Sequence, residues 1–406
     1  MNVRIHPGQA AGTVAAPPSK SMAHRMLICA GLAKGTSRIS GLAYNEDILA
    51  TMDCLRALGA ECVAEGDTVT VTGTDPRTVQ PVQALHCRES GSTLRFFIPL
   101  ALLCGETVSF TGTEKLLSRP LDIYRRLCEA RQFAFRQEPQ ALQVRGVLEG
   151  GTYRIPGDIS SQFITGLLFA LPLMSKDSRI EITPPLESRS YIDLTLQALR
   201  TFGIRAEWED SLTLLIPGGQ NYCPCDAAME GDYSGAAFYG AMNALGSRVE
   251  VMGLRPDSLQ GDRVYMGHFE SLCAGCPQID LSDCPDLGPV LFAVAAAKNG
   301  AEFTGTRRLK IKESDRAAAM ARELAPFGTT VTVEENRVIV TPTAFHAPDR
   351  ILEGHNDHRI VMSLAVLLML TGGEIRGAQA VRKSFPDFFE KLKKLGVEVH
   401  TRETDN

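Results

Sequence analysis

Along the chain, a run of apolar residues at helical spacing is followed by apolar residues at strand spacing, and this succession occurs six times. Residues 196–216 are a clear copy, in which an apolar run at helical spacing ends at Gly203 and an alternating apolar and polar stretch follows. This change of period predicts a helix followed by a pair of strands. The residues that end the runs are Gly59, Arg131, Gly203, Gly275, Gly328 and Gly396, the first four spaced 72 residues apart. Glycine suits a helix C-cap because it tolerates the left-handed conformation found there. Arg131 and Gly275 are the weaker copies.

A second series of polar residues opens an apolar helix between 38 and 42 residues before each of these positions. Its members are Ser19-Lys20-Ser21, Ser90-Gly91-Ser92, Ser160-Ser161-Gln162, Tyr233-Ser234-Gly235, Pro285-Asp286 and Asp357-His358. Free N–H groups and the helix dipole favour anions at such N-termini. For any one of them ordinary N-capping is an equally good explanation. Six equivalent openings, most with Lys or Arg nearby, predict an anion-binding function for the chain.

Six α/β units, three in each half, predict two similar domains. The stretch 217–226 is rich in Pro, Gly and Cys and is the natural boundary. We therefore expect an N-terminal-half domain at residues 19–229. The C-terminal-half domain takes residues 230–406 together with residues 1–18, because the strand expected at residues 3–5 precedes the first full unit. A length of 406 residues agrees with two or three domains of roughly 150 residues.

Composition narrows the function class. Hydrophobic residues make up 44% and charged residues 22%, which is typical of a globular protein. Lys plus Arg total 42 against 47 for Asp plus Glu, which disfavours a nucleic-acid binder. The longest apolar stretch, residues 360–370, is shorter than the roughly 20 residues that span a bilayer, and the chain opens without an apolar signal region. We expect a cytoplasmic protein without nucleic-acid or membrane partners.

Eleven scattered cysteines suit buried thiols in a reducing compartment. A structural zinc site at Cys223-Pro-Cys225 and Cys273-Ala-Gly-Cys276 is the alternative, but the two pairs lie 48 residues apart. The sequence holds no phosphate-binding Walker motif, dinucleotide glycine fingerprint or zinc-protease motif. We therefore expect neither a metal nor a cofactor.

Charged motifs lie at the ends of predicted elements. Residues 19–25 run from two prolines into a helix, with Lys20 near its start and Arg25 about one turn further on. Residues 310–316 mix both signs of charge, and residues 356–359 and 382–384 add cations. A solvated surface is the alternative for residues 310–316. Glu313 would suit a proton carrier if burial raised its pKa.

Together these motifs resemble the EPSP synthase (3-phosphoshikimate 1-carboxyvinyltransferase) family of enolpyruvyl transferases along essentially the whole chain. The most specific blocks are Ser160-Ser161-Gln162-Phe163 and Lys312-Glu313-Ser314-Asp315-Arg316, and the others are Lys20-Ser21 with Arg25, Ser90-Gly91-Ser92-Thr93 with Arg95, Arg119-Pro120, Tyr191-Ile192-Asp193, Gly231-Asp232, Pro285-Asp286, Asn356-Asp357-His358-Arg359 and Lys383-Ser384-Phe385-Pro386-Asp387. The resemblance implies an α/β fold of six βαβαββ units, forming two pseudosymmetric inside-out barrels around a cleft that holds the active site.

The resemblance also implies a reaction and its residues. The enolpyruvyl group of phosphoenolpyruvate would move to the 5-hydroxyl of shikimate 3-phosphate, releasing phosphate, in a monomer. Phosphoenolpyruvate would be bound by Lys20, Gly91, Arg119, Gln162, Arg316, Arg359 and Lys383. Shikimate 3-phosphate would be bound by Lys20, Ser21, Arg25, Ser160, Ser161, Gln162, Ser188, Tyr191, Asp286, Arg308 and Lys312. The implied catalytic residues are Asp286 for the hydroxyl proton, Glu313 for the proton at C3, and Lys20.

Three positions depart from the family pattern, and two rival functions remain. Glu89 and Arg308 stand where relatives often have Asn, and Ser190 stands where they often have Pro. A cell-wall enolpyruvyl transferase acting on UDP-N-acetylglucosamine usually carries a reactive Cys or Asp in the stretch matching residues 111–119, where this chain has neither. A non-catalytic binding protein would not need both Asp286 and Glu313.

Overall fold

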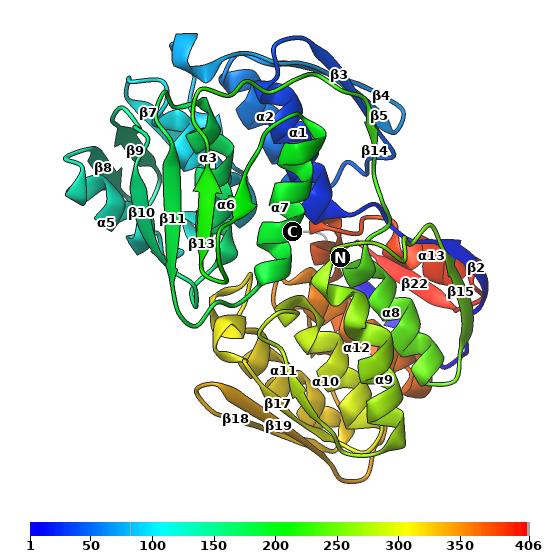
Figure 1. Cartoon of the computed structure of the whole chain (residues 1–406). Helices are drawn as coiled ribbons and strands as arrows, with labels where there is room; N and C mark the ends of the chain where they lie inside the picture. Colours follow the sequence, from blue (N-terminus) through cyan, green and yellow to red (C-terminus); the bar gives the residue numbers. More distant parts are fainter. Residues whose placement is uncertain (82, 404–406) are drawn as a thin grey trace. The chain divides into compact units, whose positions relative to one another are not determined.

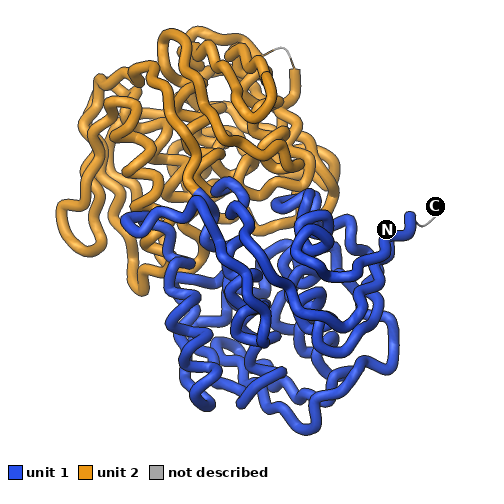
Figure 2. The backbone as a smooth tube through the Cα atoms, turned by 90° about the vertical axis from the view of Figure 1, so that its right-hand side faces the viewer, with its two compact units in different colours: residues 1–19, 231–406 blue, residues 20–230 orange. Residues whose placement is uncertain are grey.

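The computed structural model describes residues 1–81 and 83–403 (Figure 1). Residues 404–406 of the predicted C-terminal-half domain lie outside the described residues. The chain divides into two compact units: unit 1 is residues 1–19 with 231–406, and unit 2 is residues 20–230 (Figure 2). Each unit has its own cluster of buried apolar side chains.

Unit 2 holds the first seven α-helices. They are α1 (Lys20–Leu32), α2 (Glu46–Ala57), α3 (Gly91–Ala101), α4 (Glu114–Leu117), α5 (Asp122–Ala130), α6 (Ser161–Ala170) and α7 (Arg189–Thr201), with 3₁₀ helices η1 (Pro76–Thr78) and η2 (Leu171–Leu173). Its strands are β3 (Thr36–Ser40), β4 (Glu61–Glu65), β5 (Thr68–Thr72), β6 (Leu85–His86), β7 (Val108–Thr111), β8 (Ala134–Gln137), β9 (Leu142–Arg145), β10 (Thr152–Pro156), β11 (Ser178–Thr183), β12 (Glu207–Trp208), β13 (Thr213–Ile216) and β14 (Ala227–Ala228).

Unit 1 holds the remaining elements. Its helices are α8 (Tyr233–Ala244), α9 (Tyr265–Ala274), α10 (Gly288–Ala297), α11 (Arg316–Leu324), α12 (His358–Thr371) and α13 (Phe388–Lys394), with 3₁₀ helices η3 (Gly261–Val264), η4 (Pro285–Leu287), η5 (Arg307–Ile311), η6 (Ala325–Phe327) and η7 (Ala378–Lys383). Its strands are β1 (Asn2–Ile5), β2 (Ala11–Ala15), β15 (Arg248–Met252), β16 (Gln278–Asp280), β17 (Ala301–Thr304), β18 (Thr329–Val333), β19 (Arg337–Pro342), β20 (Leu352–Glu353), β21 (Gly373–Arg376) and β22 (Val399–Arg402).

The predicted sixfold repeat is confirmed by the sheets. Across residues 1–81 and 83–403 the strands form six sheets, three in each unit. Those of unit 2 have the strand orders β14-β3-β5-β4, β6-β7-β9-β8 and β10-β11-β13-β12. Those of unit 1 are β16-β17-β19-β18, β20-β21-β1-β22 and the two-stranded β15-β2. In every four-stranded sheet the first pair of strands is parallel and the other two pairs are antiparallel.

Each unit is built with helices inside and sheets outside. Nearly every residue of α1, α3 and α6 in unit 2, and of α8, α10 and α12 in unit 1, is buried. A helix that is apolar on all sides belongs in the interior of a protein. The strands instead alternate buried and exposed residues, as in β10 and β11, so each sheet keeps one face toward solvent. This arrangement confirms the predicted α/β class with an inverted layering.

The second predicted series, at the helix starts, is also confirmed. The buried helices α1, α3, α6, α8 and α12 begin within the polar segments singled out from the sequence, and η4 leads into α10 at the remaining one. The C-caps agree less completely. Gly59, Gly203, Gly328 and Gly396 adopt the left-handed conformation, with φ between 75° and 90°. The Arg131 and Gly275 copies differ.

At the weaker copies the chain leaves its helix in another way. Gly275, one of the two weaker copies, is extended, with φ of −179°, and the chain runs on through Pro277 into β16. It is therefore not a left-handed C-cap. In the Arg131 copy the left-handed residue is the next one, Gln132, with φ of 57°.

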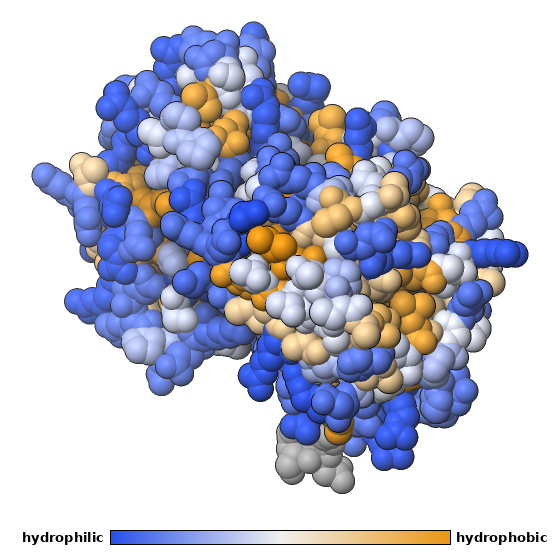
Figure 3. Space-filling model, turned by 90° about the horizontal axis from the view of Figure 1, so that it is seen from below, coloured by the Kyte–Doolittle hydropathy of each residue, from blue (hydrophilic) through white to orange (hydrophobic). Residues whose placement is uncertain are grey.

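None of the helices within the described ranges is long and apolar enough to cross a bilayer. The face of the molecule in Figure 3 is largely hydrophilic, with apolar residues in groups between charged ones. Large apolar side chains that remain exposed include Val147, Met252 and Met266.

Candidate active site

Unit 2 presents the starts of three buried helices. Lys20 is the first residue of α1, and Ser90 and Ser160 are the N-caps of α3 and α6. The Ser90 hydroxyl accepts a hydrogen bond from the N–H of Thr93 at 3.2 Å, and that of Ser160 accepts from the N–H of Gln162 at 3.3 Å. Each cap satisfies one donor, and the first turn of a helix is a favourable place for an anion.

The side chain of Gln162 joins the starts of α3 and α6. Its carbonyl oxygen accepts from Arg95 Nη1 at 2.7 Å, and its Nε2 donates to Ser92 Oγ at 2.9 Å. The Arg95 guanidinium also lies over the ring of Phe163, 5.2 Å from its centroid. Packing and hydrogen bonds therefore fix the orientation of the Gln162 amide before any ligand arrives.

Lys20 has a carboxylate partner within unit 2. Its Nζ lies 2.7 Å from Asp47 Oδ2, and both side chains are largely buried. The backbone carbonyl of Asp47 in turn accepts from Thr93 Oγ1 at 3.4 Å, which ties α2 to α3. An incoming anion at Lys20 would share the ammonium group with Asp47.

Arg25 serves the packing of α1 against α7. Its Nε donates to Thr195 Oγ1 at 2.9 Å, and its Nη2 donates to the carbonyl of Tyr191 at 2.9 Å. Its Nη1 donates to the carbonyl of Ser21, and the guanidinium lies over the Phe96 ring. Burial lowers the pKa of Arg25 to about 10, so it stays charged at neutral pH. The residue sits beside Ser21 and Tyr191, two residues predicted to bind the same ligand.

Arg119 points at the start of α3. A Cβ added at Gly91, the first residue of that helix, would lie 2.6 Å from Arg119 Nη1. In the part of the chain that the structure describes, Nε and Nη2 of Arg119 are buried without a hydrogen-bond partner. A guanidinium with two buried, unsatisfied nitrogens at a helix N-terminus is a strong attractor for an anion.

Ser188 is the N-cap residue of α7 and adopts the left-handed conformation, with φ of 58° and ψ of 40°. Its carbonyl accepts a hydrogen bond from the N–H of Tyr191 at 3.1 Å. Few residues other than glycine occupy this region, and they cluster at functional sites. The left-handed backbone at Ser188 therefore indicates a functional role for this turn.

Unit 1 gathers three carboxylates around one arginine. Arg316, at the start of α11, donates from Nη1 to Asp286 at 2.8 Å and from Nη2 to Glu313 at 2.6 Å. Its Nε donates to Asp357 at 2.9 Å. The side chain is 1% exposed. Burial lowers the pKa of Arg316, but the three carboxylates raise this pKa by more, so the net shift is upward. Both predicted proton carriers therefore share a single guanidinium.

Asp286 faces three cations at once. Besides Arg316, its carboxylate lies 3.3 Å from Lys312 Nζ and 3.2 Å from Arg359 Nη2. Burial alone would raise the pKa of Asp286, but the three cations outweigh it and hold that pKa well below its usual value. Burial also lowers the pKa of Lys312 despite the attraction of Asp286. The site is poised so that Asp286 is ionised when no substrate is bound.

Asp357, at the start of α12, also contacts this cluster. It is fully buried and caps α12, accepting from the N–H of Arg359 at 2.9 Å. Its other oxygen accepts from Ser314 Oγ at 3.0 Å as well as from Arg316. Burial would raise the pKa of Asp357, and the charge of Arg316 reverses the direction. Asp357 thus orients Arg316 rather than presenting a free oxygen to a ligand.

Two further predicted residues lie in unit 1. Arg308 is buried and its Nη2 donates to the carbonyl of Ser282. Lys383, in η7, donates to the carbonyl of Asn356 at 2.7 Å, which places it beside the start of α12. The structure therefore gathers Asp286, Lys312, Glu313, Arg316 and Arg359 in one cluster and places Lys383 at its edge.

Comparisons with known proteins now decide the family. A sequence profile of EPSP synthase (3-phosphoshikimate 1-carboxyvinyltransferase) matches residues 6–392. A 3-phosphoshikimate 1-carboxyvinyltransferase of Clostridium kluyveri is 40% identical to this chain over 98% of each sequence. One from Clostridium perfringens is 39% identical over 97% of this chain and 98% of its own. The chain belongs to the EPSP synthase family.

Solved structures share the fold of this EPSP synthase family member. An EPSP synthase of Acinetobacter baumannii superposes with a TM-score of 0.78 at 22% identity, covering 98% of this chain and 100% of its own. An enolpyruvyl transferase from Streptomyces tendae gives a TM-score of 0.79 at 15% identity, covering 98% of each chain. At such low identity these likenesses establish the fold alone.

Sequence reasoning missed Asp47 and Asp262 of this family member's candidate site, and it gave Asp357 no role. Asp47 pairs with Lys20, and Asp357 orients Arg316 from 41 positions away. Asp262 is buried and its Oδ2 accepts from Ser234. Burial, and then the charge of Asp286, raise the pKa of Asp262 to about 7. Asp357 and Asp262 lie near polar helix starts. Their partners are distant in sequence, so motif spacing alone could not indicate these contacts.

Proposed function

We propose that this EPSP synthase family member transfers the enolpyruvyl group of phosphoenolpyruvate to the 5-hydroxyl of shikimate 3-phosphate, releasing phosphate. The proposal rests on the full-length likeness to 3-phosphoshikimate 1-carboxyvinyltransferases. The pairing of Asp286 and Glu313 on the one guanidinium of Arg316 supports it, because the reaction needs two proton carriers close to bound anions. The enzyme would act as a cytoplasmic monomer without a cofactor.

Phosphoenolpyruvate would bind through groups of both units. Its phosphate would take the donors of Arg119, the Gly91 N–H, Lys20, Gln162 and Lys383. The unsatisfied, buried nitrogens of Arg119 at the start of α3 support this assignment. Its carboxylate would be held by Arg316 and Arg359, whose planar guanidinium groups suit bidentate pairing.

Shikimate 3-phosphate would be held mainly by unit 2. Its 3-phosphate would take Ser160, Ser161, Ser188 and, from unit 1, Lys312 and Arg308. Ser21 and Arg25 would face the ring carboxylate, with Gln162 and Tyr191 near the ring. The hydrogen bond from Arg25 to the Tyr191 carbonyl supports a shared location for the ring-binding residues. The residues proposed to bind substrate therefore come from both units.

The chemistry would proceed by addition and elimination. Asp286, with Lys20, would take the proton of the 5-hydroxyl as its oxygen attacks C2. Glu313, in its protonated form, would give its proton to C3, and a tetrahedral intermediate would result. Elimination would return the C3 proton to Glu313 and expel phosphate, with Lys20 and Arg119 stabilising the developing negative charge.

The cations around Asp286 would make its basicity depend on whether substrate is bound. Without substrate, Arg316, Arg359 and Lys312 hold the pKa of Asp286 low, which makes it a weak base. A substrate carboxylate and phosphate would draw the same cations toward themselves. The attraction of the cations for Asp286 would weaken, its pKa would rise, and it would become a better proton acceptor in the ternary complex.

A phosphate-release assay tests the proposal. The protein would be incubated with phosphoenolpyruvate and, in separate reactions, shikimate 3-phosphate, UDP-N-acetylglucosamine or no acceptor. We expect release only with shikimate 3-phosphate. Release with the nucleotide sugar alone would assign the chain to cell-wall chemistry, and binding of phosphoenolpyruvate without release in any reaction would make it a binding protein.

A further inference from the structure

Two histidines and a glutamate from opposite ends of unit 1 meet on the outer face of one sheet. Strands β1 and β22 pair antiparallel, with Arg4 opposite His400 and Ile5 opposite Val399. The next pair in register is His6 and Glu398, whose backbone atoms are joined by a hydrogen bond of 3.1 Å from the His6 N–H. Side chains alternate along a strand, so His6, Glu398 and His400 all project from the same face.

The ligand atoms of these three residues are close together. Glu398 Oε1 lies 2.9 Å from His400 Nε2 and 3.8 Å from His6 Nε2. One ligand atom from each residue lies within 4.8 Å of the other two. The imidazole rings meet edge to face with centroids 5.4 Å apart. The side chains are 43%, 63% and 61% exposed for His6, Glu398 and His400, so solvent reaches the cluster.

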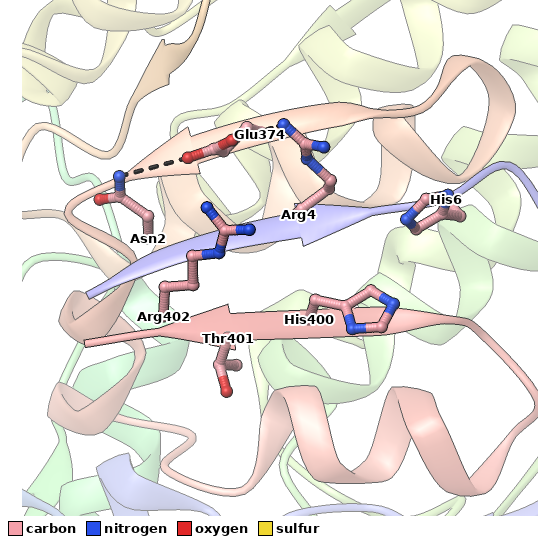
Figure 4. Close-up of a pocket in the computed structure, with 7 residues that line it drawn as sticks. All are labelled: Asn2, Arg4, His6, Glu374, His400, Thr401 and Arg402. Atoms are coloured by element: carbon pink, nitrogen blue, oxygen red, sulfur yellow. Dashed lines mark hydrogen bonds and ion pairs between the residues drawn. The ribbon is translucent and has the colours of Figure 1, made fainter. Parts of the chain in front are cut away.

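An open cavity lies beside the two imidazoles. Figure 4 shows His6 and His400 at one end of an open cavity of about 350 Å³, lined also by Asn2, Arg4, Glu374, Thr401 and Arg402. Arg4 is paired with Glu374 at 3.2 Å, which offsets its charge.

We propose that His6, Glu398 and His400 form a binding site for one first-row divalent metal ion, with Zn²⁺ as the physiological occupant. Imidazole and carboxylate are its preferred ligands outside thiolate sites, at bond lengths of about 2.0–2.2 Å. Such bonds require ligand atoms about 3.4 Å apart, and these exposed side chains reach that separation by small rotations about their χ angles. Water completes the coordination.

Occupancy would have two consequences. The metal joins the first and last strands of unit 1, so it stabilises that unit by binding only the folded state. Histidine binds metal in its neutral form, so acid weakens the site. The ligands lie on the outer face of the β1–β22 pair, whereas the carboxylate cluster lies at helix starts, so enolpyruvyl transfer does not depend on occupancy.

Metal titration of the chelator-treated full chain tests the site. Co²⁺ and Zn²⁺ are added to the wild-type protein and to His6→Ala and His400→Ala, with His86→Ala, an exposed histidine of unit 2, as the matched control. We expect one Zn²⁺ per chain at pH 7.5 and weaker binding at pH 5.5. Loss of either ligand should weaken binding by at least about tenfold, since even outer-shell partners are worth 10–100-fold. The control should bind as the wild type does.

Cobalt absorption separates this site from the cysteines. Cys223, Cys273 and Cys276 are exposed and could also take up a metal. The proposed site gives a Co²⁺ spectrum without a thiolate charge-transfer band, and Zn²⁺ raises the thermal midpoint of the wild type but not of His400→Ala. A thiolate band at the first equivalent, equal binding by His400→Ala, or no binding by the wild type would each overturn the proposal.

Discussion

Arg316 is the residue on which the candidate site of unit 1 depends. Asp286, Glu313 and Asp357 would repel one another in a buried setting, and the guanidinium between them removes that repulsion with three charge-assisted hydrogen bonds. The same guanidinium is the proposed partner of the phosphoenolpyruvate carboxylate. Substrate binding and the protonation of Asp286 and Glu313 are therefore coupled through one side chain.

Glu313→Gln and Asp286→Asn should each lower kcat by roughly 10²-fold or more, the usual scale for a general acid–base group. Both replacements keep the shape of the side chain, so binding of shikimate 3-phosphate should persist. Steady-state phosphate release measures the effect. Glu335→Gln, at an exposed position two residues before β19, is the matched control and should retain full turnover. A Glu313→Gln enzyme with near-normal kcat would remove Glu313 from the mechanism.

Arg316→Met should destabilise unit 1 strongly. It leaves three carboxylates without their shared partner, and breaking a buried ion pair in this way costs about 3–5 kcal/mol. Urea unfolding followed by circular dichroism measures the change. Arg337→Met is the control, because Arg337 is 40% exposed in its pair with Glu302 and such surface pairs contribute little to stability. Equal losses in the two variants would contradict the central place of Arg316.

Acid should weaken the fold through the carboxylates of this cluster. The pKa values of Asp286 and Asp357 are lowered in the folded chain, so their contribution to stability is complete above the unfolded value of about 3.9 and is lost as pH falls through the lower folded values. The urea concentration at the unfolding midpoint should therefore decrease as the pH is lowered below about 4. Asp357→Asn should flatten this dependence, whereas Asp349→Asn, at an exposed carboxylate, should leave it unchanged.

Among the elements, the six buried helices were the most predictable part of the fold. Each combines an apolar run with a polar opening, and both signals are local in sequence. The caps were less predictable where the following segment decides the direction of the chain, as at Gly275 before Pro277. Strand order was predictable only as a repeat, since pairing joins β1 to β22 across almost the whole sequence.

The start of α3 gives a prediction of its own. A methyl group at Gly91 would lie 2.6 Å from Arg119 Nη1, so Gly91→Ala should displace that guanidinium from the proposed phosphate site. We expect a several-fold increase in the KM for phosphoenolpyruvate with a smaller change for shikimate 3-phosphate. Gly267→Ala in α9 is the control, because an added Cβ there meets no atom within 4 Å. An unchanged KM in Gly91→Ala would show that Arg119 does not hold the substrate.

The contacts that shape the candidate site were beyond the reach of sequence. Motifs indicated Lys20, Glu313 and Arg316, but Asp47 and Asp357 approach them through folding of distant segments. The same holds for His6 and His400, which come together at the two ends of the chain. Local patterns predict which residues open a helix, and tertiary packing decides which charges they meet.

At the scale of the whole molecule, the residues proposed for substrate binding and catalysis are divided between two units with separate cores. Unit 2 contributes helix starts with Lys20 and Arg119, and unit 1 contributes Asp286, Glu313 and Arg316. Neither set alone contains both the phosphate donors and the proton carriers that enolpyruvyl transfer needs. The proposed function therefore requires the intact chain.

The most direct test of that function is a competition followed by phosphorus NMR. The protein receives phosphoenolpyruvate with equal amounts of shikimate 3-phosphate and UDP-N-acetylglucosamine, and the signals of phosphoenolpyruvate, inorganic phosphate and both acceptors are followed together. We predict that the phosphoenolpyruvate signal is replaced by inorganic phosphate while the shikimate 3-phosphate signal alone shifts to that of an enolpyruvyl product. Consumption of the nucleotide sugar, or loss of phosphoenolpyruvate with both acceptors unchanged, would contradict it.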